Sequence, residues 1–205
     1  MSKEDIILIN NFITQEENDA LLEYEKYLTE NELWETSDLK GDPYQQWTKR
    51  FVGVQNLVLE ERGFNKPWDL EIKELAIKIR KRVRAAIEEA YGVEGRIWAD
   101  SLNLIRWTEG VEQTPHSDYE NLNGEPHIYN WRDIGVVIYL NNDFKGGQIA
   151  FPQHRYAVTV EPRLLAFFPG DVNHVHGVTM IEEGVRYTLN MFYTFTEAHK
   201  DQLEQ

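Results

Sequence analysis

The sequence has no cysteine among its 205 residues, which excludes disulfide bonds, thiolate metal sites and cysteine nucleophiles. This absence also fits a reducing compartment, and we expect a cytoplasmic protein. Long apolar runs are missing as well. None approaches the roughly 20 residues of a membrane helix, and the N-terminus has no basic start followed by an apolar stretch. We therefore expect no membrane partner.

Positive charge is scarce in the sequence. Lys and Arg number 21 against 35 Asp and Glu, so the formal net charge is -14 at pH 7. A chain with this charge repels phosphate backbones, and we expect no nucleic-acid partner. The one basic run, residues 78–84 (KIRKRVR), falls within a helical pattern, and we interpret it as a solvated helix face.

Helical and strand patterns are both present, in a chain long enough for one domain over residues 1–205. The N-terminal part predicts a strand within residues 5–12. The capping box of Thr14 and Glu17 then predicts a helix that ends near residue 30. Apolar residues at helical spacing predict a longer helix over residues 66–92.

The C-terminal part consists of short runs rich in β-branched and aromatic residues, separated by turns. The predicted strands lie at 97–107, 134–140, 147–151, 156–160, 164–168 and 186–195. Strands at this spacing favour a sandwich or jelly roll, in which two sheets packed face to face cover their edges. We therefore predict an α+β fold with a β core over residues 96–195 and a helical support over residues 1–95.

Two histidine-containing segments follow predicted strands of this core. PHSDYE (115–120) contains His116 and Asp118, and HVH (174–176) follows the apolar strand 164–168. Two imidazoles and one carboxylate can occupy one face of a six-coordinate ion and leave other positions open, which suits Fe(II), although Mn²⁺ and Zn²⁺ accept the same donors. The H-x-D pattern alone is weak evidence, so a polar loop without a metal is the alternative.

The segment GVRYTLNMFY (184–193) predicts a strand whose alternation places Arg186, Thr188 and Asn190 on one face. On an inward face, Arg186 could bind the carboxylate of a small molecule through two parallel hydrogen bonds. An arginine on the surface face of the strand is the alternative.

Three blocks, in order along the chain, resemble the Fe(II)- and 2-oxoglutarate-dependent oxygenases, and within them the prolyl 4-hydroxylase-like branch. They are WTEGVEQTPHSD (107–118), RDIGVVIYLNNDFKGGQIAFP (132–152) and HGVTMIEEGVRYTLNMFY (176–193). The N-terminal segment IILINNFITQEEN (6–18) is also similar to the start of that family. The resemblance implies a double-stranded β-helix (jelly-roll) core with an N-terminal strand and supporting helices.

The same resemblance implies a set of site residues. His116, Asp118 and His176 match the iron ligands. Arg186 and Tyr139 match the residues that bind the far carboxylate of 2-oxoglutarate. Trp107 stands where the family usually has a tyrosine near this cosubstrate, so a hydroxyl contact is not expected from this position.

Several other positions carry weaker implications. Arg132 matches a family arginine near the peptide substrate, with a loop salt bridge to Asp133 or another neighbour as the alternative. Gln113 replaces a common aromatic residue. His174 competes with His176 for the second histidine position, and the family spacing, with Gly eight and Arg ten residues later, selects His176. We interpret the histidines at 127, 154 and 199 as ordinary loop or tail residues.

The implied activity is that of a 2-oxoglutarate-dependent dioxygenase that uses Fe(II), 2-oxoglutarate and O2, with ascorbate as a candidate reductant, to hydroxylate a C–H bond. Peptidyl-proline 4-hydroxylation, as in procollagen-proline 4-dioxygenases, is the favoured reaction, with a proline-containing peptide or protein as partner. Loops 40–51 and 119–132, rich in Tyr, Trp and Asn, could fold over such a peptide or be solvated surface loops. The alternatives are hydroxylation of lysine or a free amino acid, and a cupin-like metal- or peptide-binding module without oxygenase activity.

Overall fold

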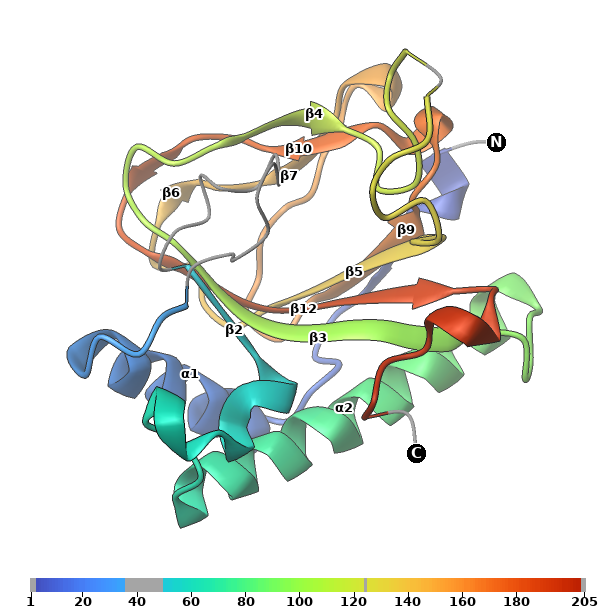
Figure 1. Ribbon diagram of the computed structural model, residues 1–205. Coiled ribbons are helices and arrows are strands. Elements are labelled where there is room, and N and C mark those ends of the chain that lie inside the picture. The colour runs from blue at the N-terminus through green and yellow to red at the C-terminus, as the bar shows by residue number, and fades with distance from the viewer. Residues whose placement is uncertain (1–2, 36–49, 124, 204–205) are drawn as a thin grey trace.

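Two helices form one layer of the computed structural model, which describes residues 3–35, 50–123 and 125–203 (Figure 1). α1 (Gln15–Glu30) begins with the predicted capping box, since Thr14 Oγ1 accepts a hydrogen bond from the Glu17 N–H and Glu17 Oε2 accepts one from the Thr14 N–H. α2 (Pro67–Tyr91) ends at Gly92, whose φ of 63° is left-handed. Both predicted helices are therefore present.

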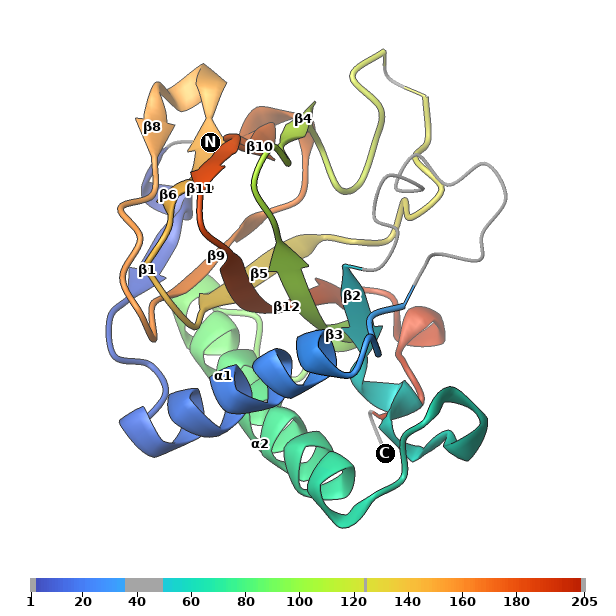
Figure 2. The same cartoon turned by 90° about the vertical axis from the view of Figure 1, so that its left-hand side faces the viewer.

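The helices pack against one face of a six-stranded antiparallel sheet (Figures 1 and 2). Its strands, in spatial order, are β1 (Ile7–Ile9), β9 (Leu165–Pro169), β5 (Ile134–Tyr139), β12 (Arg186–Thr194), β3 (Trp98–Trp107) and β2 (Phe51–Gly53). Alternation along β12 sends Leu189 and Met191 into the core shared with the helices. Arg186 and Asn190 consequently lie on the opposite face, as predicted, where they line a cavity.

A smaller sheet faces the large one on the side away from the helices, above it in Figure 1. Its order is β4 (Gln113–His116), β10 (His176–Val178), β7 (Ile149–Phe151) and β8 (Tyr156–Ala157). β6 (Lys145–Gly146) and β11 (Ile181–Glu183) form a separate pair. The two facing sheets make a double-stranded β-helix, or jelly roll, and the predicted α+β fold class is confirmed.

The structure also differs from the sequence prediction. It contains five short strands that the sequence patterns do not indicate, namely β2, β4, β6, β10 and β11. Each has between two and four residues, too few for alternation to show. β1 and β2 form the two edges of the large sheet, so residues 1–95 contribute strands to the core as well as helical support. His116 and His176 lie on short strands themselves, whereas the sequence indicated only that they follow predicted strands.

The basic run 78–84 forms ion pairs within the chain. Arg80 is buried, and its Nη1 lies 2.6 Å from Asp201 Oδ2. The Nη2 of Arg82 lies 2.6 Å from Glu17 Oε2. The interpretation as a solvated face is therefore wrong for Arg80, because helical periodicity does not reveal that the C-terminal segment folds back onto α2.

Two further expectations concern the surface. Within the described ranges, no helix combines the length and the apolar character that a membrane span requires. Most of the predicted loop 40–51 lies outside the described residues, while loop 119–132 is described apart from residue 124.

Candidate active site

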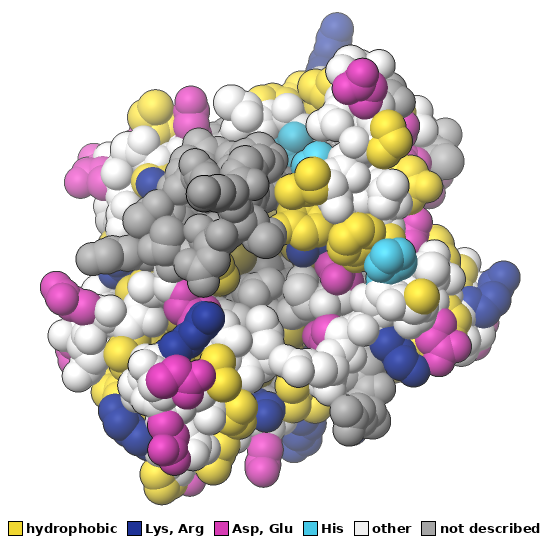
Figure 3. Space-filling view, in the orientation of Figure 1, with side chains coloured by type: hydrophobic (Ala, Val, Ile, Leu, Met, Phe, Trp, Pro, Cys, Tyr) yellow, Lys and Arg dark blue, Asp and Glu magenta, His cyan; other side chains and the backbone are white. Residues whose placement is uncertain are grey.

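A cavity of about 350 Å³ lies between the two sheets. Strands β3, β5 and β12 of the large sheet contribute to one wall, and β4, β7 and β10 of the small sheet contribute to the other. Most of the predicted site lines this space: Trp107, His116, Asp118, Arg132, His176 and Arg186. In the space-filling view, histidine side chains reach the surface beside a hydrophobic patch (Figure 3).

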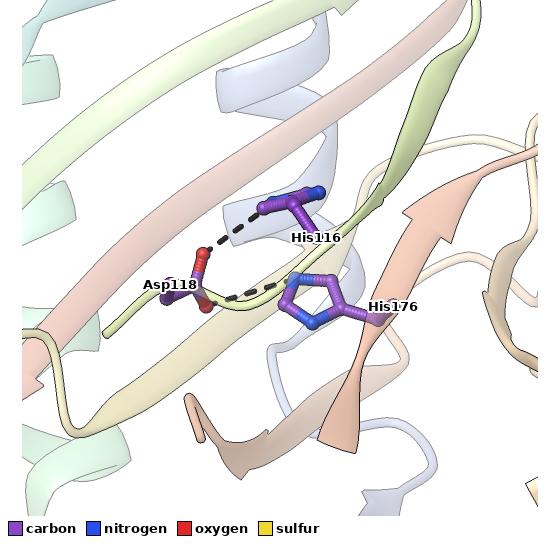
Figure 4. Close-up of side chains that lie close together, drawn as sticks. All are labelled: His116, Asp118 and His176. Atoms are coloured by element: carbon purple, nitrogen blue, oxygen red, sulfur yellow. Dashed lines mark ion pairs between the residues drawn. The ribbon is translucent and has the colours of Figure 1, made fainter. Parts of the chain in front are cut away.

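His116, Asp118 and His176 form one compact group within the cavity wall (Figure 4). The antiparallel pair β4–β10 places His116 directly opposite His176, and Asp118 follows β4 by two residues. The Nε2 of His116 lies 3.5 Å from Asp118 Oδ1, and the Nε2 of His176 lies 3.6 Å from Asp118 Oδ2. One ligand atom from each residue lies within 4.8 Å of the other two, close enough for all three to bind a single metal ion.

Backbone carbonyls orient both imidazoles. The carbonyl of Thr114 accepts a hydrogen bond from His116 Nδ1 at 2.9 Å, and that of His174 accepts one from His176 Nδ1 at 3.0 Å. These bonds place the proton on Nδ1 and leave Nε2 of each ring to act as a metal ligand. The amide nitrogen of Gln113 lies 3.3 Å from His116 Nε2, so this replacement for the family aromatic contacts the site directly.

Packing around the carboxylate depends on a glycine. Asp118 is buried, and its N–H donates to the Gly170 carbonyl at 2.9 Å. A Cβ at Gly135 on β5 would lie 2.8 Å from Asp118 Oδ2 and 2.9 Å from a ring carbon of Phe168. The ring of Phe168 packs edge-on against His176, with centroids 4.4 Å apart. Only a residue without a side chain therefore fits beneath the carboxylate.

The electrostatics of Asp118 and His176 match the protonation states that a metal requires, whereas those of His116 do not. Burial opposes ionisation of Asp118, but His176 and His116 favour the carboxylate, and the pKa of Asp118 is lowered. Burial lowers the pKa of His176 to about 4 against the influence of Asp118. For His116, burial opposes protonation but Asp118 outweighs it, so its pKa is raised. Near neutral pH the site therefore contains an anionic Asp118 and a neutral His176.

His174 takes no part in this group. Its ring is buried, with Nδ1 2.8 Å from Asp171 Oδ1 and Nε2 3.6 Å from Asp5 Oδ2. Of the two histidines, His176 belongs to the group that could hold a metal ion. Of the remaining histidines, His154 lies 2.9 Å through Nε2 from the Asn173 carbonyl, and His199 stacks on Trp131.

Arg186 occupies the inner face of β12 and is 1 % exposed, so the surface alternative is excluded. The guanidinium carbon lies 5.4 Å from the ring centre of Trp107 and 4.9 Å from that of Tyr139. None of its three nitrogens has a hydrogen-bond partner among the described residues. Burial lowers the pKa of Arg186, and Tyr139 counteracts this. A buried guanidinium without a partner suits a carboxylate ligand.

The rings of Tyr139 and Trp107 both lie beside Arg186, and of the two Trp107 lines the cavity. The hydroxyl of Tyr139 accepts a hydrogen bond from the Ile149 N–H at 3.3 Å, which leaves its own proton available to a ligand. Trp107 is buried and contributes a ring face to Arg186, so the position lacks a hydroxyl, as the sequence predicts.

Arg132 lines the cavity on the other side of the metal group. Its Nε donates to Asp100 Oδ2 at 2.7 Å, and its guanidinium lies between the rings of Tyr129 and Phe192, 3.8 Å and 4.1 Å from their centres. The salt-bridge partner is therefore Asp100 and not Asp133. The carboxylate of Asp133 instead accepts the Phe195 N–H. The structure is compatible with a substrate contact as well, because Arg132 faces the cavity.

Sequence reasoning missed several residues that shape the site. Asp100 and Phe192 belong to predicted strands, and the strand pattern does not show that they hold Arg132. Gly135 looks like any small residue in an apolar run. Each acquires its role through residues distant in the chain, so local sequence contains no signal for it.

Comparison with known proteins supports the resemblance. A family model described as the 2OG-Fe(II) oxygenase superfamily matches residues 102–194. Prolyl 3-hydroxylase 3 of Mus musculus is 40% identical over 84 residues, which are 38% of this chain and 11% of that protein. Prolyl 3-hydroxylase 1 of Gallus gallus is 25% identical over 211 residues, 89% of this chain and 29% of that protein. The chain thus spans less than a third of the length of these curated relatives.

Solved structures share the fold. A viral collagen prolyl hydroxylase from Paramecium Bursaria Chlorella virus-1 aligns with a TM-score of 0.63 and 14% identity, covering 94% of this chain and 97% of that one. A Pseudomonas putida prolyl-4-hydroxylase aligns with a TM-score of 0.60 and 15% identity, covering 94% and 93%. A prolyl hydroxylase from Trichoplax adhaerens, in complex with a hypoxia inducible factor peptide fragment, aligns with a TM-score of 0.64 and 17% identity. This alignment covers 97% of this chain and 86% of that one.

Proposed function

The chain belongs to the 2OG-Fe(II) oxygenase superfamily, and from this premise we propose that it hydroxylates a prolyl residue of a polypeptide. The observation that supports this most directly is that one cavity holds both the group of His116, Asp118 and His176 and the guanidinium of Arg186, which has no hydrogen-bond partner in the described part of the chain. A metal module without oxygenase activity would have no use for a buried arginine that lines the cavity and lacks a hydrogen bond among the described residues.

The residues present fit Fe(II) and 2-oxoglutarate, which the superfamily implies. His116, Asp118 and His176 would hold the metal, and Arg186 with the Tyr139 hydroxyl would hold the far carboxylate of 2-oxoglutarate. Bound together with O2, these groups supply the oxidising chemistry that hydroxylates an unactivated C–H bond. Arg186 also supplies positive potential for a dianion in a protein whose net charge is -14.

The residues of the chain itself position the reactants and limit water. Asp118 is 3 % exposed and Arg186 is 1 % exposed, so both charges act in a medium of low polarity where their attraction for a ligand is strong. Trp107 and Phe168 cover apolar parts of the same cavity. This arrangement favours a cosubstrate held at both ends and shielded from bulk solvent.

Two positions of hydroxylation are candidates on the prolyl ring. The sequence blocks led us to expect hydroxylation at C4, and neighbours in the structure comparison include a prolyl-4-hydroxylase. The relatives found by sequence are named prolyl 3-hydroxylases, with 40% identity over 84 residues in one case, and this observation favours C3 as the second candidate. Separation of 3-hydroxyproline from 4-hydroxyproline in the hydrolysed product distinguishes them.

The test of the proposal has two steps. Anaerobic titration with Fe(II) and 2-oxoglutarate should produce the weak visible charge-transfer band of an Fe(II)–2-oxoglutarate chelate, and this band should be missing in His176→Ala. Proline-containing peptides are then supplied with O2 and ascorbate, and succinate is measured together with hydroxyproline. If the band forms and succinate appears only with lysine peptides or free amino acids, the prolyl assignment is wrong. If 2-oxoglutarate is never consumed, the protein is a binding module.

A further inference from the structure

The cavity has a second polar region that the metal and cosubstrate residues do not use. On its large-sheet wall, Ser101 and Asn103 of β3 and Asn190 of β12 direct polar side chains into the space. In the β12–β3 pair, Asn190 lies directly opposite Asn103, and Phe192 lies opposite Ser101. These three side chains, which we call the amide row, therefore form a continuous strip across neighbouring strands, which run side by side in Figure 1.

Two atoms of the amide row are buried without partners. Ser101 Oγ and Asn190 Oδ1 are shielded from solvent and have no hydrogen-bond partner within the described residues 3–35, 50–123 and 125–203. A hydroxyl or carboxamide in an ordinary core position is nearly always paired, because an unpaired buried polar atom is unfavourable. Polar atoms that line a cavity and lack a partner are suited to a ligand that supplies one.

Two members of the amide row, Ser101 and Asn103, lie on β3, which is one strand further than β12 from the strand beneath Asp118. Along β12, Asn190 is two inward positions away from Arg186, with Thr188 between them. Asp118 lies above Gly135 on β5, and β5 and β3 flank β12 on opposite sides. Asn190 lies opposite Val137, between Gly135 beneath Asp118 and Tyr139 beside Arg186, so it borders the space between the metal group and Arg186. Ser101 and Asn103 lie one strand to the side of that space.

The chemistry of the amide row selects a neutral ligand. Serine and asparagine provide both donors and acceptors and no charge. The nearest basic side chains on this side of the cavity already have anionic partners: Arg132 pairs with Asp100, and Arg62 pairs with Glu35. An anionic ligand would find no unpaired positive charge among these side chains. A main-chain amide, with one N–H and one C=O, can both donate a hydrogen bond to a carboxamide and accept one from it.

We infer that Ser101, Asn103 and Asn190 bind main-chain amide groups of the substrate polypeptide beside the residue that is hydroxylated. This inference rests on the proposed function, since it requires a peptide substrate. Phe192 and Tyr129, which enclose Arg132, border the same part of the cavity and offer apolar faces to the side chains or rings of the peptide. The row then fixes the register of the chain relative to the metal group and acts as a specificity element.

The test uses the full chain and a pool of proline-containing decapeptides. Asn190→Leu and Asn103→Leu keep the side-chain size and remove the hydrogen bonds, and Ser101→Ala is a smaller change that preserves the fold if the leucine variants misfold. Gln202→Leu is the matched control, because Gln202 is exposed and lies in the C-terminal segment. The readouts are the KM for the pooled peptides, and the affinity for 2-oxoglutarate from the anaerobic charge-transfer titration without peptide.

Each amide-row variant should raise the peptide KM by about tenfold, which corresponds to the loss of roughly one hydrogen bond to a buried group. Ser101→Ala and Asn103→Leu should leave the 2-oxoglutarate affinity within about twofold of wild type. An unchanged peptide KM, or an equal loss of 2-oxoglutarate affinity, overturns the inference while the proposed function stands. A wild type that binds 2-oxoglutarate but turns over no peptide overturns the proposed function itself, and the peptide role of the row with it.

Discussion

His116 and His176 face each other as direct partners in the β4–β10 pair, with ring centroids 4.6 Å apart. They are separated by 60 positions in the sequence, and a single strand pairing brings them together. Because Asp118 lies only two residues after the end of β4, the same pairing also brings the carboxylate to the two imidazoles. A shift of one residue in this register would turn one imidazole to the other face of the sheet and dismantle the group.

Replacing His174 and His176 one at a time should show which of the two binds Fe(II). We expect His176→Ala to lower Fe(II) affinity by more than the roughly 10–100-fold typical of losing an outer partner of a ligand, because it removes a ligand itself. His174→Gln and the partly exposed control His154→Ala should retain the metal. Fe(II) binding is measured by anaerobic equilibrium dialysis. Loss of the metal in His174→Gln with retention in His176→Ala would reverse the assignment.

Replacing Arg186 should stabilise the metal-free protein and weaken the binding of 2-oxoglutarate. Its guanidinium is buried without a hydrogen bond among the described residues, so Arg186→Met should raise the free energy of unfolding of the metal-free protein by about 1 kcal/mol or more. The same change removes charge-assisted hydrogen bonds of about 1.5–3 kcal/mol and should lower 2-oxoglutarate affinity by roughly 10–150-fold.

Thermal unfolding with and without Fe(II) and 2-oxoglutarate under anaerobic conditions measures both effects of Arg186→Met. The exposed Lys81→Met on α2 serves as the control for removing a positive charge. A variant that is less stable without ligands, yet still stabilised by 2-oxoglutarate, would contradict the assignment of Arg186 as a ligand-binding residue.

Gly135 should be intolerant of even one methyl group. The added Cβ of Gly135→Ala would meet Asp118 Oδ2 at 2.8 Å and Phe168 at 2.9 Å, so we expect a stability loss of about 1–3 kcal/mol and weaker Fe(II) binding. The double variant with Phe168→Leu relieves the ring contact alone. Isothermal titration with Fe(II) should show that metal affinity stays low in the double variant. Full recovery would mean that the ring, and not the carboxylate, is what the methyl group displaces.

Glu25 should make the stability of the protein depend on pH. This carboxyl on α1 is fully buried, and neither oxygen has a hydrogen-bond partner among the residues that the structure describes. Burial raises its pKa well above the usual value, although Arg186 and Arg106 act in the opposite direction. The folded state thus holds a proton that the unfolded state releases above about pH 4.5, so this contribution to stability is lost as the pH rises toward the folded-state pKa.

The slope from Glu25 should reach about 1.4 kcal/mol per pH unit at most, and Glu25→Gln should remove it. Urea unfolding of wild type and variant from pH 5 to pH 8 measures the difference, and the relative stability of Glu25→Gln should increase with pH. The exposed Glu71→Gln on α2 is the control and should show no such trend. Parallel pH profiles for wild type and Glu25→Gln would show that Glu25 is ionised in the folded protein.

The sequence by itself determined those features whose signals are local. The capping box at Thr14 and the glycine after α2 mark helix ends because they satisfy backbone groups within a few residues. The spacing of His116 to Asp118, and of His176 to Arg186, is a local signal of the same kind. So is the strand alternation that places Arg186 and Asn190 on one face.

Only the tertiary structure decided which of these residues meet, and what surrounds them. Arg132 pairs with Asp100, 32 residues earlier in the chain, and not with its neighbour Asp133. Glu25 lies in an amphipathic helix whose sequence gives no sign that one carboxyl is fully buried. Strands of two to four residues, among them the pair that joins the two histidines, acquire their structure from partners across the fold, because so short a segment has too little intrinsic preference of its own.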